Sequence, residues 1–98
     1  MDRFREVDPG DLYLPPPRAS GADPFKLAEQ IRRFGDSVLG MPPVEVTEAR
    51  DGALMINDGV TRATRIAKLR PGDTNPVEVI DRRPGWSLDR LHRVREML

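Results

Sequence analysis

The chain has 98 residues, 38% of them apolar and 33% charged, which is enough for one domain with a single modest core. Sixteen basic side chains balance sixteen acidic ones, so there is no overall electrostatic attraction to nucleic acid or to a membrane surface. Cysteine is absent, and this excludes disulfides, thiolate zinc sites and a cysteine nucleophile. No apolar run reaches the roughly 18 residues of a membrane span and no signal peptide is visible, so we expect a cytoplasmic protein without a membrane partner.

We interpret residues 1–98 as one domain that opens with a proline-rich segment over residues 1–22. Within this segment, the pattern leaves open a strand over residues 4–7 or over residues 11–14. A helix is expected next, because Asp23 suits the N-cap and Pro24 suits the first helical position. Apolar residues then recur at helical spacing up to Phe34, and Gly35 is placed to end the helix.

A hairpin is predicted after this helix. Residues 44–47 alternate between apolar and polar side chains, Asp51-Gly52 is a favoured hairpin turn, and Leu54 and Ile56 alternate again. A second helix is expected over residues 60–69, closed by Pro71-Gly72, and a further strand over residues 77–80. This order suggests a crossover between strands of one sheet.

A third helix is predicted over residues 86–98. Ser87 suits its N-cap, Asp89 suits the positive end of the helix dipole, and Trp86 and Leu91 have the spacing of a hydrophobic staple. We expect this C-terminal helix to pack on the sheet, with a homodimer interface as the alternative. The fold class is therefore α+β, with a small mixed sheet and about three helices.

Arg62 has an unusual position at the start of the second predicted helix. On a helical wheel, the solvent-facing side is formed by Thr61, Thr64, Arg65 and Lys68. Arg62 instead projects at the edge of the apolar side, in the first turn, where the free N–H groups already carry partial positive charge. An anion must compensate for both features. It can be a local carboxylate, for which Asp58 four residues earlier is the candidate, or it can be a ligand.

The turn before Arg62 has the parts of a phosphate site. Gly59 allows the backbone to approach a ligand closely, the N–H groups of the helix start point outward, and Thr61 adds a hydroxyl. By spacing alone, the local pair with Asp58 and the ligand site remain equally good interpretations.

Four segments together resemble the ParB N-terminal domain and sulfiredoxin superfamily. They are ADPFKLAEQIRRFG, MPPVEV, LMINDGVTRATRIAKL and NPVEVID, and they cover about residues 23–81 in the order typical of that superfamily. Its members have a helix that opens with Asp-Pro-x-Lys, a strand that begins after proline, and a strand that runs into a Gly-x-x-Arg turn and helix.

The resemblance implies a nucleotide site at the Gly-x-x-Arg turn, here Gly59 to Arg62, with Lys26 near the phosphates. It therefore favours Arg62 as a phosphate ligand. The residues expected to bind a nucleotide or another phosphorylated ligand are Lys26, Asn57, Asp58, Gly59, Thr61, Arg62 and Arg65. An accompanying Mg²⁺ is left open.

The sequence also departs from the superfamily. The catalytic cysteine of sulfiredoxin would fall at Val60, so sulfinic-acid reduction is excluded. The helix-turn-helix and dimerisation domains of partition-type ParB proteins have no counterpart in these 98 residues. We therefore expect a nucleotide- or phosphate-binding ParB-like module whose catalytic status the sequence does not decide.

Three alternatives remain. The first is a ParB-like nuclease or nucleotide hydrolase, although Asp58 is the one acid that can be placed at the turn. The second is a DNA-binding protein, which would use the basic residues Arg82, Arg83, Arg90, Arg93 and Arg95. The third is a protein-interaction module with a decayed site. His92 has no second histidine beside it, so it is interpreted as a solvated residue and no metal site is expected.

Overall fold

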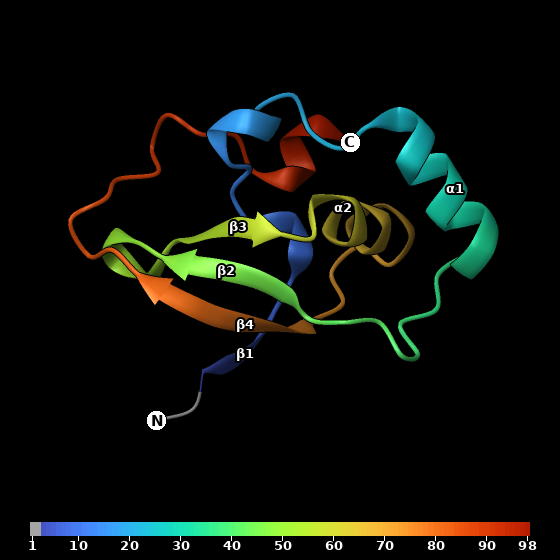
Figure 1. Cartoon of the computed structure of the whole chain (residues 1–98), viewed down its shortest axis with the longest axis horizontal. Coiled ribbons are helices and arrows are strands. Elements are labelled where there is room, and N and C mark those ends of the chain that lie inside the picture. The colour runs from blue at the N-terminus through green and yellow to red at the C-terminus, as the bar shows by residue number, and fades with distance from the viewer. Residues whose placement is uncertain (1–2) are drawn as a thin grey trace.

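A four-stranded mixed sheet forms the centre of the fold in the computed structural model, which describes residues 3–98 (Figure 1). In space the strands follow the order β1-β4-β2-β3. The parallel pair is β2 with β4, whereas β1 with β4 and β2 with β3 are antiparallel. The bounds are β1 (Phe4–Val7), β2 (Val44–Glu48), β3 (Leu54–Asp58) and β4 (Asn75–Arg82). The predicted α+β class with a small mixed sheet is confirmed.

The predicted hairpin joins β2 to β3. Asp51 and Gly52 occupy its turn with φ angles of 61° and 78°. The Ala53 N–H donates to the Arg50 carbonyl and closes the turn. Positive φ at two successive residues is the geometry that favours Asp-Gly in hairpins, because it matches the twist of the two strands. The sequence therefore determines this turn locally.

Two α-helices occur within residues 3–98, and both have the predicted bounds. In α1 (Pro24–Phe34), the Asp23 carboxylate caps the first turn by accepting from the N–H groups of Phe25 and Lys26. The second helix, α2 (Val60–Leu69), connects β3 to β4, and it packs between the sheet and α1 (Figure 1). Neither helix combines the length and the apolar character that crossing a bilayer requires.

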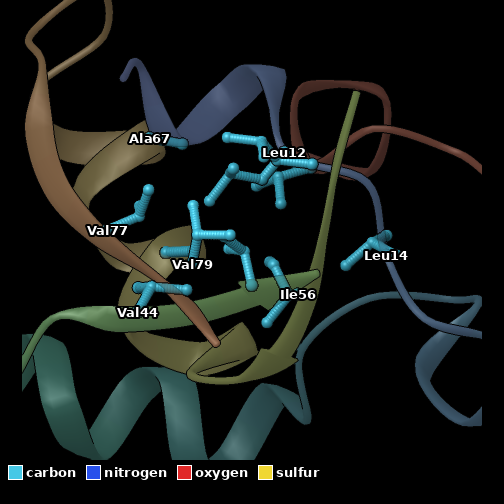
Figure 2. Close-up of a cluster of buried hydrophobic side chains, with 11 residues drawn as sticks. Leu12, Leu14, Val44, Ile56, Ala67, Val77 and Val79 are labelled. Atoms are coloured by element: carbon cyan, nitrogen blue, oxygen red, sulfur yellow. The ribbon is translucent and has the colours of Figure 1, made fainter. Parts of the chain in front are cut away.

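The hydrophobic core lies between the sheet and α2 (Figure 2). It collects alternate residues of the strands, two alanines of α2 and three residues from segments outside the sheet. Its buried members are Leu12, Leu14, Val44, Val46, Leu54, Ile56, Ala63, Ala67, Val77, Val79 and Val94. By contrast, α1 contributes no buried residue, so α1 is attached to the outside of the domain.

The N-terminal segment contains one strand and one extended pairing. The strand predicted over residues 4–7 is confirmed as β1, at the edge of the sheet next to β4. Residues 11–14 do not form a strand of their own, but Tyr13 lies along β3. The Tyr13 N–H donates to the Leu54 carbonyl, and the Ile56 N–H donates to the Tyr13 carbonyl.

The C-terminal helix predicted over residues 86–98 is wrong. Residues 92–94 are held extended against residues 12–14, because the Leu14 N–H donates to the His92 carbonyl and the Val94 N–H donates to the Leu12 carbonyl. These backbone groups are therefore not available for helical bonds. Only a short 3-10 helix, Val94–Met97, follows. Ser87 does accept from the Asp89 N–H as a cap would, but only a turn follows it.

The apolar residues at the C-terminus also differ from the prediction. Leu88 and Val94 are buried, whereas Trp86 is half-exposed. The guanidinium carbon of Arg83 lies 5.4 Å from the ring centroid of Trp86. The expected staple between Trp86 and Leu91 is therefore absent, and the helical surface on which the homodimer alternative depended does not exist.

One carboxylate links three strands. Glu48 of β2 accepts from Arg5 of β1 at 2.5 Å and from Arg82 of β4 at 3.1 Å. The hydrogen bond from Arg5 is the main reason that the pKa of Glu48 lies below its usual value, and the positive charge of Arg82 adds to it. Glu48 is therefore expected to support the packing of β1 and β4 beside β2.

Leu88→Ala should lower the free energy of unfolding by about 2–4 kcal/mol, because it leaves a cavity in a buried position that is 5% exposed. The matched control is Leu98→Ala, since Leu98 is 57% exposed and should cost less than about 0.5 kcal/mol. Urea denaturation of both variants measures the difference. Equal losses would contradict the observed burial of the C-terminal segment.

Glu48→Gln should destabilise the protein by about 1 kcal/mol at pH 7, because Glu48 bonds two arginines in a partly exposed network. The folded pKa of Glu48 is lowered, so its stabilising contribution is present above the unfolded pKa, about 4.3, and is lost as the pH falls through the folded pKa. The variant and the parent should therefore converge in stability at acidic pH. Chemical denaturation at pH 7 and below pH 3 checks this, with Glu6→Gln at an exposed position of β1 as the control.

Candidate functional site

A cleft of about 550 Å³ lies where the end of β3, the start of α2 and the side of α1 meet. Its floor is the turn from Asn57 to Arg62, and one wall is α1. The other wall is the proline-rich segment that leads into α1. Side chains with polar or charged groups in the lining are Arg18, Asp23, Lys26, Gln30, Asn57, Asp58, Thr61 and Arg62.

Gly59 and Arg62 are in direct contact. Gly59 has a φ of 111°, which allows β3 to turn directly into α2. A Cβ at this position would lie 2.8 Å from Nη2 of Arg62 and 3.1 Å from its Cζ. The guanidinium of Arg62 therefore lies against the bare backbone of Gly59. Glycine suits the backbone angle here, and its missing side chain leaves the space that the end of Arg62 occupies.

Arg62 is only partly neutralised. Its Nη2 is 3.6 Å from Oδ2 of Asp58, and it also donates to the Pro43 carbonyl at 3.3 Å. Asp58 is 71% exposed, so this is a long ion pair in solvent and contributes little. Within residues 3–98, the buried Nε of Arg62 has no hydrogen-bond acceptor. The predicted local pair thus exists, but it does not satisfy the guanidinium.

The two helices that border the cleft begin differently. The first turn of α1 is capped by Asp23. The backbone N–H of Lys26, and to a smaller extent that of Phe25, holds the pKa of this carboxyl below its usual value. The N-cap of α2 is Gly59, which has no side chain that could cap the first turn. The N–H groups at the start of a helix carry partial positive charge and need acceptors. The uncapped start of α2 therefore makes the cleft attractive to an anion.

The structure brings together six of the seven expected ligand residues. Lys26, Asn57, Asp58, Gly59, Thr61 and Arg62 all line the cleft. Asn57 is oriented by the buried Thr47, whose hydroxyl donates to the Asn57 side-chain carbonyl at 3.0 Å. The local pattern of the turn was enough to identify the residues of the floor, whereas Lys26 was placed by the family resemblance.

Arg65 is the exception, and its expected solvent exposure is wrong. Its side chain is not among those lining the cleft, and the residue is 2% exposed. Thr64 is also buried, with its hydroxyl donating to the Val60 carbonyl. The helical wheel predicts one buried side, but α2 also buries Arg65 on another side, because the end of α1 and the linker to β2 cover it. The packing of α1 on α2 is a tertiary contact that the wheel cannot contain.

Sequence reasoning did not place the side chains of Arg18 and Gln30 in the cleft. Arg18 reaches it from the short 3-10 helix Pro16–Arg18, and Gln30 reaches it from the inner side of α1. The three prolines before Arg18 are a signal for a stiff segment. They do not indicate where that segment points. Gln30 lies one turn after Lys26 on α1, so helical spacing could have placed both on one side.

The other singled-out residues do not join this site. His92 is exposed, with its Nδ1 3.5 Å from a carboxylate oxygen of Glu96. Within residues 3–98, no three histidine, aspartate or glutamate side chains gather closely enough to hold a metal ion.

Comparison with known proteins adds no relative: no family profile, no curated protein and no solved structure matches this chain.

Gly59→Ala should destabilise the protein more than the same change at Gly72. Both glycines have positive φ, 111° and 85°, so alanine is strained at each by about 1–3 kcal/mol. At Gly72 an added Cβ meets nothing within 4 Å, whereas at Gly59 it displaces the Arg62 guanidinium. Thermal denaturation compares the two variants. Equal destabilisation would contradict the prediction and would show that the side chains of Arg62 and Val44 yield to an added Cβ at little cost.

Proposed function

We propose that the cleft binds the phosphate groups of a nucleotide or of another phosphorylated ligand. The observation that carries this proposal is the state of Arg62. Its guanidinium lines the cleft beside the uncapped start of α2, and its only carboxylate partner within residues 3–98 is the exposed Asp58 at 3.6 Å. A phosphate can supply the acceptors that both the guanidinium and the helix N–H groups need.

The charges of the cleft support an anionic ligand. Three cationic side chains line it, those of Arg18, Lys26 and Arg62. Of the two carboxylates, Asp23 is occupied by the N–H groups of α1, and Asp58 is at the exposed edge. Because the cations come from three separate segments, they can surround a phosphate group from different sides.

The size of the cleft suits a nucleotide. Small-molecule sites usually have volumes of roughly 300–1,000 Å³, and this cleft has about 550 Å³. The apolar residues Pro15, Pro17, Met55 and Ile56 also line it, so the cleft offers surface for a base or sugar beside the cations.

The resemblance to the ParB N-terminal domain and sulfiredoxin superfamily remains part of this proposal. Of the four segments that carry the resemblance, the one that forms α1 and the one that forms β3 and α2 supply residues to the cleft. The segment that leads into β2 supplies Pro43, whose carbonyl accepts from Arg62 beside the cleft. The Gly-x-x-Arg turn and the lysine of the Asp-Pro-x-Lys helix start lie in the same cleft. That arrangement is what a phosphate site of this type requires.

The DNA-binding alternative receives less support, because several of its arginines are bonded to carboxylates. Arg82 bonds Glu48, Arg83 bonds Asp81, and Arg95 bonds both Asp8 and Asp11. A phosphate backbone would have to displace these partners.

Arg62→Ala should weaken binding of a nucleoside triphosphate by roughly 10- to 100-fold, since a charge-assisted hydrogen bond contributes about 1.5–3 kcal/mol. The unliganded variant should keep about the parent stability, because Asp58 is exposed and is not left as a buried charge. Titrations of a panel of nucleotides, followed by amide shifts of residues 57–62, measure the affinity. Arg70→Ala is the control, since Arg70 follows the same helix and pairs with Asp73.

Two results would count against the proposal. One is a parent protein whose amide signals at residues 57–62 do not respond to any nucleotide or to inorganic phosphate. The other is a loss of unliganded stability of about 3–5 kcal/mol in Arg62→Ala, which would indicate a structural ion pair instead of a ligand site.

A further inference from the structure

A second, smaller cavity of about 200 Å³ lies on the other side of Arg62, between α1, α2 and the linker over residues 35–43. Gln30 and Arg62 line both this cavity and the larger cleft. The remaining wall is formed by Arg65 of α2 and by apolar side chains of the linker and of the end of α1, which include Phe34, Met41 and Pro42.

Arg65 is a buried cation without a carboxylate partner within residues 3–98. It is 2% exposed, and its Nη1 donates to the carbonyls of Gly35 and Ser37, both at 2.8 Å. Nη2 lies 3.3 Å from the sulfur of Met41, and the guanidinium lies over the ring of Phe34. These contacts satisfy much of the donor fork but do not neutralise its charge. Asp36 attracts the guanidinium without forming an ion pair, so the charge of Arg65 is only partly compensated, which is costly in such a place.

Three buried polar atoms around this cavity have no hydrogen-bond partner within residues 3–98. They are Nε of Arg62, Nε of Arg65 and Oε1 of Gln30. Residues three apart on a helix are neighbours on its surface, so Arg62 and Arg65 lie on one side of α2. The structure thus places two N–H donors that lack acceptors on residues that line one small cavity.

We propose that this cavity is an inner subsite for an oxyanion, a carboxylate or phosphate group, bound by the Nε–H groups of Arg62 and Arg65. Gln30 can add a donor, because a half-turn of its amide exchanges the oxygen for the NH₂ group. Apolar side chains beside the guanidinium groups lower the local dielectric and so strengthen the attraction between these groups and an anion.

The size of the cavity limits the ligand. About 200 Å³ admits a carboxylate or phosphate group but lies below the roughly 300 Å³ at which sites for whole small molecules begin. Arg62 and Gln30 line both spaces, so the two sites share these side chains. The inner subsite itself centres on Arg65 and does not depend on nucleotide binding in the outer cleft.

Arginine Nε–H signals in ¹H–¹⁵N spectra of the full chain test the proposal directly. Inorganic phosphate and acetate are titrated separately, in a buffer without other oxyanions. The expected result is a saturable shift of the Arg65 Nε–H signal and at least a tenfold slowing of its exchange with water. Arg65→Lys, which keeps the charge but removes the Nε–H donor, should abolish the inner binding event, whereas Arg32→Lys on the exposed side of α1 should leave it unchanged.

The outcomes separate the inner subsite from the outer one. Shifts of both Arg65 and Arg62, with the Arg65 shift surviving in Lys26→Ala, support an inner subsite beside an outer phosphate site. A shift of Arg65 supports the inner subsite even if the amides of residues 57–61 do not respond. If those amides are silent toward phosphate and also toward the panel of nucleotides, the same result overturns the proposed function. If those amides and Arg62 respond while the Arg65 signal does not shift with either anion, the inner subsite alone is overturned. If Arg65→Lys does not fold, the parent spectra still decide, with Arg65 assigned through its own backbone.

Discussion

The direct turn from β3 into α2 at Gly59 is the constraint on which the site depends. A single residue with φ of 111° ends the edge strand and starts the helix, so the first turn of α2 opens beside the end of β3. The same residue has no side chain, and the guanidinium of Arg62 fills that space. One backbone conformation thus exposes the N–H groups of the helix start and positions the cation beside them.

The wall of the cleft that carries Lys26 and Gln30 is held in a different way. α1 has no buried residue, so apolar packing alone does not attach it firmly to the domain. Arg65 compensates by donating to the carbonyls of Gly35 and Ser37, directly after the helix, and by lying over Phe34 at its end. Burial lowers the pKa of Arg65, but an arginine stays charged under ordinary conditions. A charged group in the interior therefore connects α1 to α2, and both cavities have α1 as a wall.

Elements whose signals are local were predicted well. Asp23-Pro24 and Gly35 delimit α1, Asp51-Gly52 makes the hairpin turn, and the helix over residues 60–69 has the expected bounds. Each of these depends on capping groups or allowed φ angles within a few residues. The C-terminal residues show the opposite case. Their apolar spacing fits a helix, but backbone bonds from residues 92–94 to residues 12–14 compete successfully, and these partners are some 80 residues apart in the chain.

The sequence by itself thus determined the local parts of the site, namely the glycine, the hydroxyl and the arginine of one turn, because a strand-to-helix turn is encoded by adjacent residues. Tertiary structure decided which distant side chains meet that turn. Arg18 and Gln30 reach the cleft, and Arg65 becomes buried, only because α1 and its flanking segments fold over the outer side of α2. The physical reason is that the spacing of apolar residues in one helix shows which of its own sides is apolar. When a second helix is attached through polar contacts, neither helix carries a periodic apolar pattern that would indicate the contact.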